Sequence, residues 1–318
     1  MKKISEGHFA GRIDDFFEQK RSLGYDYKDY YYKLGLFAVF AAENYPTETT
    51  LTRELALAWC AQKDNESKAT QNKKILALRQ FAKYLLSIGE TAYVIPSSFI
   101  HKGLQRPIRI LSIDEIAALW HALDEMKPSQ PNSVRHLVFP VIFRTIYCCG
   151  LRPSEALKLR IEDVNLKHGI LDIKESKGHK SRIVVMPEDL TGYCRNYERL
   201  IRKRLPNRTA FFPNTLGAQF CYQSLWKEFK NVWSAAKISD KQPRIYDFRH
   251  SFATHRLYLW MKEGKDIDAM LPYLSAYMGH FSPSDTYYYI HFVPGLLRTL
   301  SGQDFSDCQH LLPEVPNL

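Results

Sequence analysis

One stretch of the 318-residue chain, residues 246–291, combines an arginine, histidines and a run of tyrosines. Arg249 is followed directly by His250, and Tyr289 lies nine residues after His280. An arginine side chain offers a rigid fork of donors to phosphate oxygens, and a histidine can donate one more hydrogen bond. A tyrosine hydroxyl can attack phosphorus as a nucleophile. These residue types therefore suit the cleavage of a phosphodiester.

The same residues also have simpler interpretations. A histidine that follows glycine is usually a cap or a surface residue, and clustered tyrosines more often pack than react. Tyr287 and Tyr288 are alternatives to Tyr289 as the nucleophile. The stretch therefore indicates a catalytic site only if other matching motifs occur upstream in a fixed order.

Two helices are expected to position this stretch. Asp247 can cap the first helix, whose first turn contains Arg249. Pro272 fits the first turn of the second helix, where its missing N–H costs nothing, and Gly279 ends that helix. Residues 282–285 begin a new turn that leads into the tyrosines. His280 is therefore expected at a helix end.

A second arginine is predicted in a turn further upstream. Residues 134–149 are apolar nearly all round, which predicts a buried helix. Gly150 ends that helix and begins the segment Gly-Leu-Arg-Pro-Ser-Glu. The turn presents Arg152 as a phosphate ligand, and Glu155 lies close enough along the chain to orient it.

A β-hairpin is predicted next, because the hydrophobic period changes at residue 169. In this segment Ile170, Asp172 and Lys174 alternate with Leu171 and Ile173, and residues 182–186 are rich in β-branched side chains. The polar segment between them, Glu-Ser-Lys-Gly-His-Lys, contains a glycine. Lys177 lies near the expected tip, and Lys180 is the competing candidate for a functional lysine.

Taken in order, these segments resemble the signature of the tyrosine recombinases, or phage integrase family. The family pattern contains G-L-R-x-S-E, a K-G-x-K-x-R hairpin, H-x-x-R-H, L-G-H and a tyrosine nine residues further on. Five of the six active-site positions agree in type and order, namely Arg152, Lys177, Arg249, His280 and Tyr289. The sixth position holds Tyr246, where the family usually has histidine. The segment before Gly279 is also longer than usual and contains Pro272.

The resemblance implies a site-specific DNA recombinase that needs neither ATP nor another cofactor nor a metal. Tyr289 would attack a backbone phosphate and form a 3′-phosphotyrosine link, and Lys177 would protonate the leaving 5′-oxygen. The non-bridging oxygens would be braced by Arg152, Arg249 and His280. Tyr246 would donate a supporting hydrogen bond but is a doubtful group for proton transfer, since phenol is neutral near pH 7.

The expected fold is mainly α with a small β-sheet, in two domains. Residues 1–95 predict a helical core-binding domain, and residues 96–110 form a basic, proline-containing linker. Residues 111–293 form the α+β catalytic domain, which opens with a capping box formed by Ser112 and Glu115. Residues 294–318 are a tail that docks on a neighbouring subunit, packs on its own domain or stays loose.

In the first domain an apolar stripe is predicted along one helix, formed by Ile13, Phe16, Phe17 and Leu23. A later helix, residues 69–86, carries or adjoins basic side chains that form either a solvated face or a DNA contact: Lys68, Lys73, Lys74, Arg79 and Lys83. The same two interpretations apply to a denser basic run in the second domain, formed by Arg195, Arg199, Arg202, Lys203, Arg204 and Arg208.

Composition agrees with a nucleic-acid partner. The formal net charge is +10, which favours a polyanionic partner, nucleic acid first and an anionic membrane second. The family resemblance implies that the partner is double-stranded DNA with a specific recombination site. No run of eighteen apolar residues and no secretory signal is present, so no membrane association is expected. The six cysteines lack C-x-x-C spacing, which indicates reduced thiols and a cytoplasmic protein.

Two other functions remain open at this point. The chain could be a catalytically silent DNA-binding protein with the same fold, for which Tyr246 is the only support. It could also be a type IB topoisomerase, which shares the chemistry but does not exchange strands. The family implies a homotetramer on DNA and a role in integration, excision or transposition of a mobile element.

Overall fold

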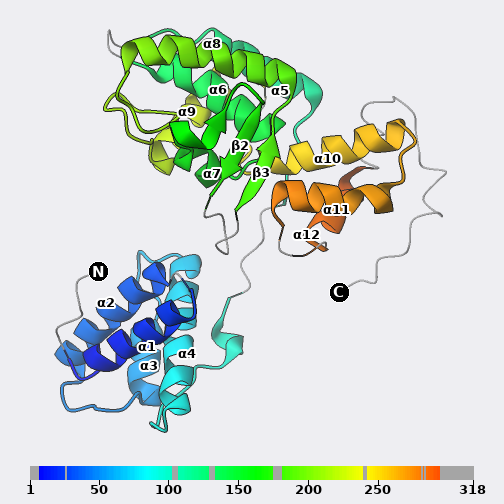
Figure 1. Ribbon diagram of the computed structural model, residues 1–318. Helices are drawn as coiled ribbons and strands as arrows, with labels where there is room; N and C mark the ends of the chain where they lie inside the picture. Colours follow the sequence, from blue (N-terminus) through cyan, green and yellow to red (C-terminus); the bar gives the residue numbers. More distant parts are fainter. Residues whose placement is uncertain are drawn as a thin grey trace. The chain divides into compact units, whose positions relative to one another are not determined.

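The computed structural model describes residues 7–25, 27–101, 107–128, 133–174, 181–238, 242–280, 282 and 284–293. The chain divides into two compact units, Met1–Arg106 and Pro107–Leu318. Most of the described residues are helical, and three short strands form one sheet (Figure 1). The predicted fold class, mainly α with a small β-sheet, is confirmed.

The first unit is a bundle in which α4 packs against each of the other α-helices. Its elements are α1 (Ala10–Ser22), α2 (Lys28–Asn44), α3 (Arg53–Cys60), α4 (Lys68–Ser87) and the 3-10 turn η1 (Ser97–Phe99). The side chains of Thr52 and Ser67 cap α3 and α4 by accepting backbone N–H groups. Phe16, Phe37 and Phe81 are fully buried in the core.

Two expectations for this unit are wrong. Leu23 is 62% exposed, because α1 ends at Ser22 and Leu23 leaves the apolar stripe there. Lys74 is buried and pairs with Glu66 at 2.8 Å while its ammonium lies over the ring of Trp59. Lys74 therefore belongs to neither a solvated face nor a DNA contact.

The second unit places helices around a small antiparallel sheet of order β1-β2-β3. Its first part comprises α5 (Ile113–Asp124), α6 (Arg135–Cys148), α7 (Pro153–Lys158), η2 (Ile161–Asp163), β1 (Val164–Asn165), β2 (Ile170–Ile173), β3 (Arg182–Val185), α8 (Glu188–Arg204) and α9 (Tyr222–Ala235). The predicted hairpin is present, with Ile173 opposite Arg182, although its tip at residues 175–180 lies outside the described residues. The capping box of Ser112 and Glu115 is present.

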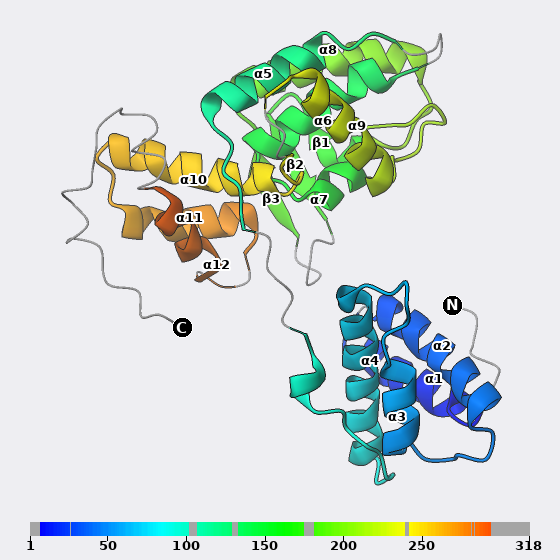
Figure 2. The same ribbon diagram turned by 180° about the vertical axis from the view of Figure 1, so that it is seen from behind.

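The last part of the chain forms a separate layer of the second unit, visible from both sides (Figures 1 and 2). It contains α10 (Asp247–Lys262), α11 (Ile267–Met278), α12 (Ser284–Tyr287) and η3 (Tyr288–Phe292). These elements share a small apolar core that includes Phe252, Leu271, Met278 and Tyr289. The active-site candidates of this layer are therefore positioned by an apolar core that the layer itself forms.

Both predicted helix starts in this layer are wrong in detail. Tyr246 precedes α10, and the carboxylate of Asp247 instead accepts the backbone N–H of Arg244 at 2.7 Å and its guanidinium at 2.8 Å. In α11 the cap is Asp266, so Pro272 lies inside the helix and not in its first turn. Because Asp266 caps the helix, α11 begins at Ile267, which is several residues upstream of the start that Pro272 would favour.

Arg208, expected on a basic face, is 6% exposed and pairs with Glu198. Like Lys74, it is removed from any surface contact with phosphate. No helix in the described part of the chain is long and apolar enough to cross a membrane. The five cysteines that the structure describes are free thiols.

Candidate active site

Arg249 is fully buried, and its guanidinium joins the ends of two other helices. Nη1 donates to the carbonyl of Gly150 at 2.5 Å, and Nη2 donates to the carbonyl of Met278 at 2.6 Å. The partial negative charge at helix C-termini favours a cation there. Burial, and next the nearby Arg152, lower the pKa of Arg249 to about 10, so it remains a cation at neutral pH.

The two helices that hold Arg249 end in the same backbone motif. After the last residues of α6 and α11 respectively, Gly150 and Gly279 adopt left-handed conformations with φ of +57° and +65°. The residue after each glycine donates its N–H at 3.0 Å to the carbonyl five positions earlier. The predicted helix ends at both glycines are confirmed. Arg152 lies two residues after Gly150, and His280 directly follows Gly279, so both side chains lie near Arg249.

Glu155 fixes the direction of Arg152. Arg152 Nη1 donates to Glu155 Oε1 at 2.6 Å, and the backbone N–H of Arg152 donates to Oε2 at 2.9 Å. Arg152 Nη2 also donates to the carbonyl of Gly279 at 3.0 Å. The first arginine is therefore tied both to its own turn and to the end of α11.

Arg182 is a member of this network that the sequence did not reveal. From β3 it donates to both carboxylate oxygens of Glu155 at 2.9 Å, and its Nε donates to the carbonyl of Tyr277 at 2.8 Å. These bonds connect the hairpin with α7 and α11. The available signal was its place as the last residue of the K-G-x-K-x-R segment.

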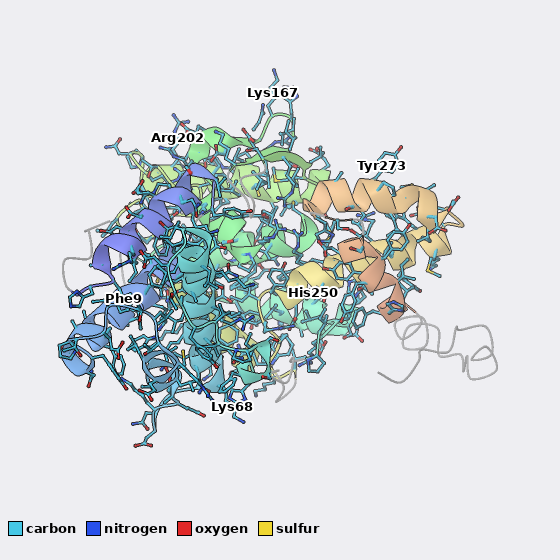
Figure 3. All side chains as sticks on the ribbon, turned by 90° about the horizontal axis from the view of Figure 1, so that it is seen from below. Phe9, Lys68, Lys167, Arg202, His250 and Tyr273 are labelled. Atoms are coloured by element: carbon cyan, nitrogen blue, oxygen red, sulfur yellow. The ribbon has the colours of Figure 1, made fainter. Side chains whose placement is uncertain are left out.

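Of the three consecutive tyrosines, Tyr289 is the one that faces the site. It is 3% exposed, whereas Tyr287 and Tyr288 are 46% and 49% exposed. Its hydroxyl oxygen lies 2.9 Å from Nδ1 of His250, a residue labelled on α10 in Figure 3. Its ring stacks on that of His280, with centroids 6.0 Å apart. Burial raises the pKa of Tyr289 above its usual value, so the free hydroxyl is a neutral phenol.

His280 is held by a hydrogen bond on one side of its ring. Nδ1 lies 2.6 Å from the hydroxyl oxygen of Thr286, a fully buried side chain. Burial, and next the charge of Arg249, lower the pKa of His280 to about 4. The ring is therefore neutral near pH 7 and its orientation is set by Thr286.

The remaining sequence candidates lie apart from these contacts or outside the described residues. Tyr246 is 37% exposed at the start of α10, and its ring centroid is 5.0 Å from that of His250. Lys177 and Lys180 lie outside the described residues. The described site thus brings together Arg152, Arg249, His280 and Tyr289, with Tyr246 at its margin.

This arrangement is suited to an anionic group. Two guanidinium groups and two imidazoles gather around one phenol, and Arg249 Nε is buried without a hydrogen-bond partner among the described residues. Within the same part of the chain, no group of His, Cys, Asp or Glu side chains could hold a metal ion.

Comparisons with known proteins identify the family of the chain. Residues 109–294 match the model of the phage integrase family. A putative integrase/recombinase, y4rE, of Sinorhizobium fredii is 30% identical over 302 residues, which cover 93% of this chain and 96% of the relative. The tyrosine recombinase XerD of Pseudomonas putida is 29% identical over 251 residues, 78% of each chain.

Solved structures show the same fold at low sequence identity. The XerH site-specific recombinase, in a post-cleavage complex with a palindromic difH substrate, has a TM-score of 0.60 at 20% identity, covering 86% of this chain and 78% of XerH. A lambda integrase(75-356) dimer bound to a COC′ core site has a TM-score of 0.59 at 15% identity, covering 88% of this chain and 94% of that one. The match of the family model to more than half of the chain establishes the relationship. The chain belongs to the phage integrase family, the tyrosine recombinases, which are enzymes that break and rejoin DNA.

Proposed function

We propose that this chain recombines specific DNA sites through a 3′-phosphotyrosine intermediate, with Tyr289 as the nucleophile. The observation that carries the proposal is the placement of one buried tyrosine against two imidazoles, beside arginines anchored on two helix ends. The exposed Tyr287 and Tyr288 lack this setting. Double-stranded DNA is the proposed partner, in keeping with the net charge of +10.

In the proposed reaction the Tyr289 oxygen bonds to phosphorus while the bond from phosphorus to the 5′-oxygen breaks. Arg152, Arg249 and His280 stabilise the charge that grows on the two non-bridging oxygens. Lys177 gives a proton to the leaving 5′-oxygen. Rejoining reverses these steps without ATP, because the phosphotyrosine conserves the energy of the phosphodiester bond.

The two units are proposed to act together on the DNA. The helical domain, residues 1–95, grips the duplex, and the catalytic domain, residues 111–293, performs the chemistry. A homotetramer on DNA and the movement of a mobile element are proposed from the family relationship. Exposed basic residues such as Lys68 remain candidates for phosphate contacts in the first unit.

Covalent capture tests the proposal. The protein is mixed with a library of nicked, partly randomised duplexes, and SDS-resistant adducts are isolated and sequenced. Tyr289→Phe should abolish the adduct, whereas Tyr287→Phe and Tyr288→Phe should retain it. An adduct that survives Tyr289→Phe would refute the assignment of the nucleophile.

Two further observations separate the proposal from its rivals. Arg152→Ala should slow adduct formation by about 100-fold or more, as the loss of an oxyanion-hole donor does. DNA binding without any adduct would indicate a silent binding protein. Relaxation of supercoiled plasmid by monomers, without exchange of strands, would indicate a topoisomerase.

A further inference from the structure

The nucleophilic tyrosine of the proposed reaction must lose a proton as it attacks, and the structure holds a nitrogen at that hydroxyl. We infer that His250 is a catalytic residue, the general base that accepts the proton of Tyr289 through Nδ1. Nδ1 lies 2.9 Å from the hydroxyl oxygen, within the 2.6–3.2 Å reach of a direct proton transfer. This inference rests on the proposed function, to which it adds a residue.

Backbone packing fixes this contact. His250 lies in the first turn of α10, directly after the buried Arg249, and η3 packs against α10. Tyr289 belongs to the small apolar core of the same layer, and the His250 and Tyr289 ring centroids are 5.5 Å apart. The arginine that approaches the phosphate and the base that faces the nucleophile are therefore adjacent on one helix turn.

Neighbouring groups are less suited to accept the proton. The carboxylate of Asp247 is 1% exposed and already accepts the guanidinium and the backbone N–H of Arg244. Nδ1 of His280 is engaged by Thr286. Tyr246 offers only a phenol hydroxyl, which is a poor proton acceptor compared with an imidazole nitrogen.

His250 is in the required protonation state before reaction. Burial lowers its pKa to about 4, while Asp247 raises it and Arg244 and Arg249 lower it further. The neutral ring can accept a hydrogen bond from the phenol. An anionic phosphate that enters the site favours the imidazolium, because a nearby opposite charge stabilises the charged form.

The Tyr289 oxygen bonds to phosphorus, the bond to the 5′-oxygen breaks, and the phenolic proton moves to His250 Nδ1. The 5′-oxygen takes its proton from the general acid, proposed above as Lys177. In rejoining, the 5′-hydroxyl gives its proton back to the general acid as its oxygen bonds to phosphorus. The bond from phosphorus to the Tyr289 oxygen breaks, and the His250 imidazolium returns its proton to that oxygen.

The test uses the full-length protein and a nicked duplex recovered by covalent capture with the wild-type chain. Single-turnover adduct formation is measured for His250→Ala and His250→Gln, with DNA binding measured in parallel. Glutamine can hold the phenol by a hydrogen bond but cannot take its proton. Both variants should bind DNA and be slower by about 100-fold, the lower end of the usual contribution of a general base.

Imidazole in solution should restore the rate of His250→Ala by at least tenfold, and more basic substituted imidazoles should restore it further. A purely structural role of His250 would not produce this dependence on basicity. His255→Ala is the matched control, because it removes a second imidazole of α10, which is buried and contacts Tyr147 instead of Tyr289. Its residual activity should not respond to imidazole.

The inference is overturned by a wild-type rate in either His250 variant, or by slow variants that no imidazole accelerates. If the wild-type chain itself forms no adduct at Tyr289, the proposed function fails and this inference fails with it. An adduct in the wild type with an inert His250 would overturn the inference alone.

Discussion

Arg182 and Glu155 form a bidentate ion pair with two N–O distances of 2.9 Å, and their side chains are 10% and 3% exposed. The same carboxylate accepts two hydrogen bonds from Arg152. One buried acid therefore orients a proposed phosphate ligand and anchors the strand that leads from the lysine hairpin. Removing one partner from a buried network of this kind leaves charges without compensation.

Glu155→Ala should lower the free energy of unfolding by about 3 kcal/mol, because two guanidinium groups lose their buried partner. It should also slow adduct formation, since Arg152 loses its orientation. Urea unfolding followed by circular dichroism measures the first effect. Glu188→Ala is the control, as its exposed pair with Arg195 is worth about 1 kcal/mol or less. Equal, small losses in both variants would contradict this role for Glu155.

Gly279→Ala should disturb the site through a collision. A Cβ at this position would lie 2.9 Å from Cδ and 3.0 Å from Nη1 of Arg182, in a backbone with φ of +65°. Gly264→Ala isolates the backbone contribution, because Gly264 has φ of +70° and no atom within 4 Å of its Cβ position. The left-handed conformation alone should cost about 1–2 kcal/mol in both variants.

The difference between the two alanine variants then reports the displacement of Arg182. Gly279→Ala should lose at least tenfold in the rate of adduct formation, whereas Gly264→Ala should remain near the wild-type rate. Identical rates for the two variants would show that Arg182 moves aside without consequence. Rates are compared at a temperature at which both variants are folded.

The lysine of the hairpin can be identified by changing the leaving group. A duplex with sulfur in place of the bridging 5′-oxygen needs no proton donor, because a thiolate leaves readily. Lys177→Ala should be slow on the oxygen duplex and near the wild-type rate on the sulfur duplex. Lys180→Ala should retain its rate on both. Rescue of Lys180→Ala instead would transfer the acid role to that residue.

Stability should fall as the solution is acidified, because three buried or half-buried histidines resist protonation. Burial lowers the pKa values of His250, His255 and His280 to about 4, from a usual value of 6.5. Between these values the unfolded chain binds protons that the folded chain does not. The contribution of these three groups to the free energy of unfolding is therefore fully present above pH 6.5 and is lost as the pH falls towards 4.

The midpoint of urea unfolding should accordingly be lower at pH 5.0 than at pH 7.5. His255→Gln removes one of the three titrating groups away from the active site, and its midpoint should change less between the two pH values. A midpoint that stays constant or rises on acidification would contradict the burial of these imidazoles.

Local patterns were sufficient to predict much of the fold. The capping box at Ser112, the helix ends at Gly150 and Gly279 and the hairpin strands all depend on short-range chemistry, and the structure contains them. Predictions failed where a competing neighbour decided the outcome. Asp266 capped α11 ahead of Pro272, and Arg244 captured the carboxylate of Asp247.

The candidate site was predicted unevenly for a related reason. Arg249, His280 and Tyr289 belong to motifs with fixed spacing, so their types and order were recognisable. The contacts of Arg182 with Glu155 and of His250 with Tyr289 join segments far apart in the chain. Such pairings depend on how β3, α7, α10 and η3 pack, and no periodicity along the chain encodes that packing.

The Arg249 guanidinium donates to two backbone carbonyl groups, those of Gly150 and Met278. Every amino acid supplies the same carbonyl, so a substitution at Gly150 or Met278 does not itself delete a hydrogen bond of Arg249; it acts through the direction of the backbone and through side-chain packing. Sequence drift around the arginine is therefore tolerated as long as the two turns keep their shape and the core beside them stays packed. A search for inactivating mutations should accordingly concentrate on Gly150 and Gly279, whose lack of a side chain sets the direction in which those carbonyls point.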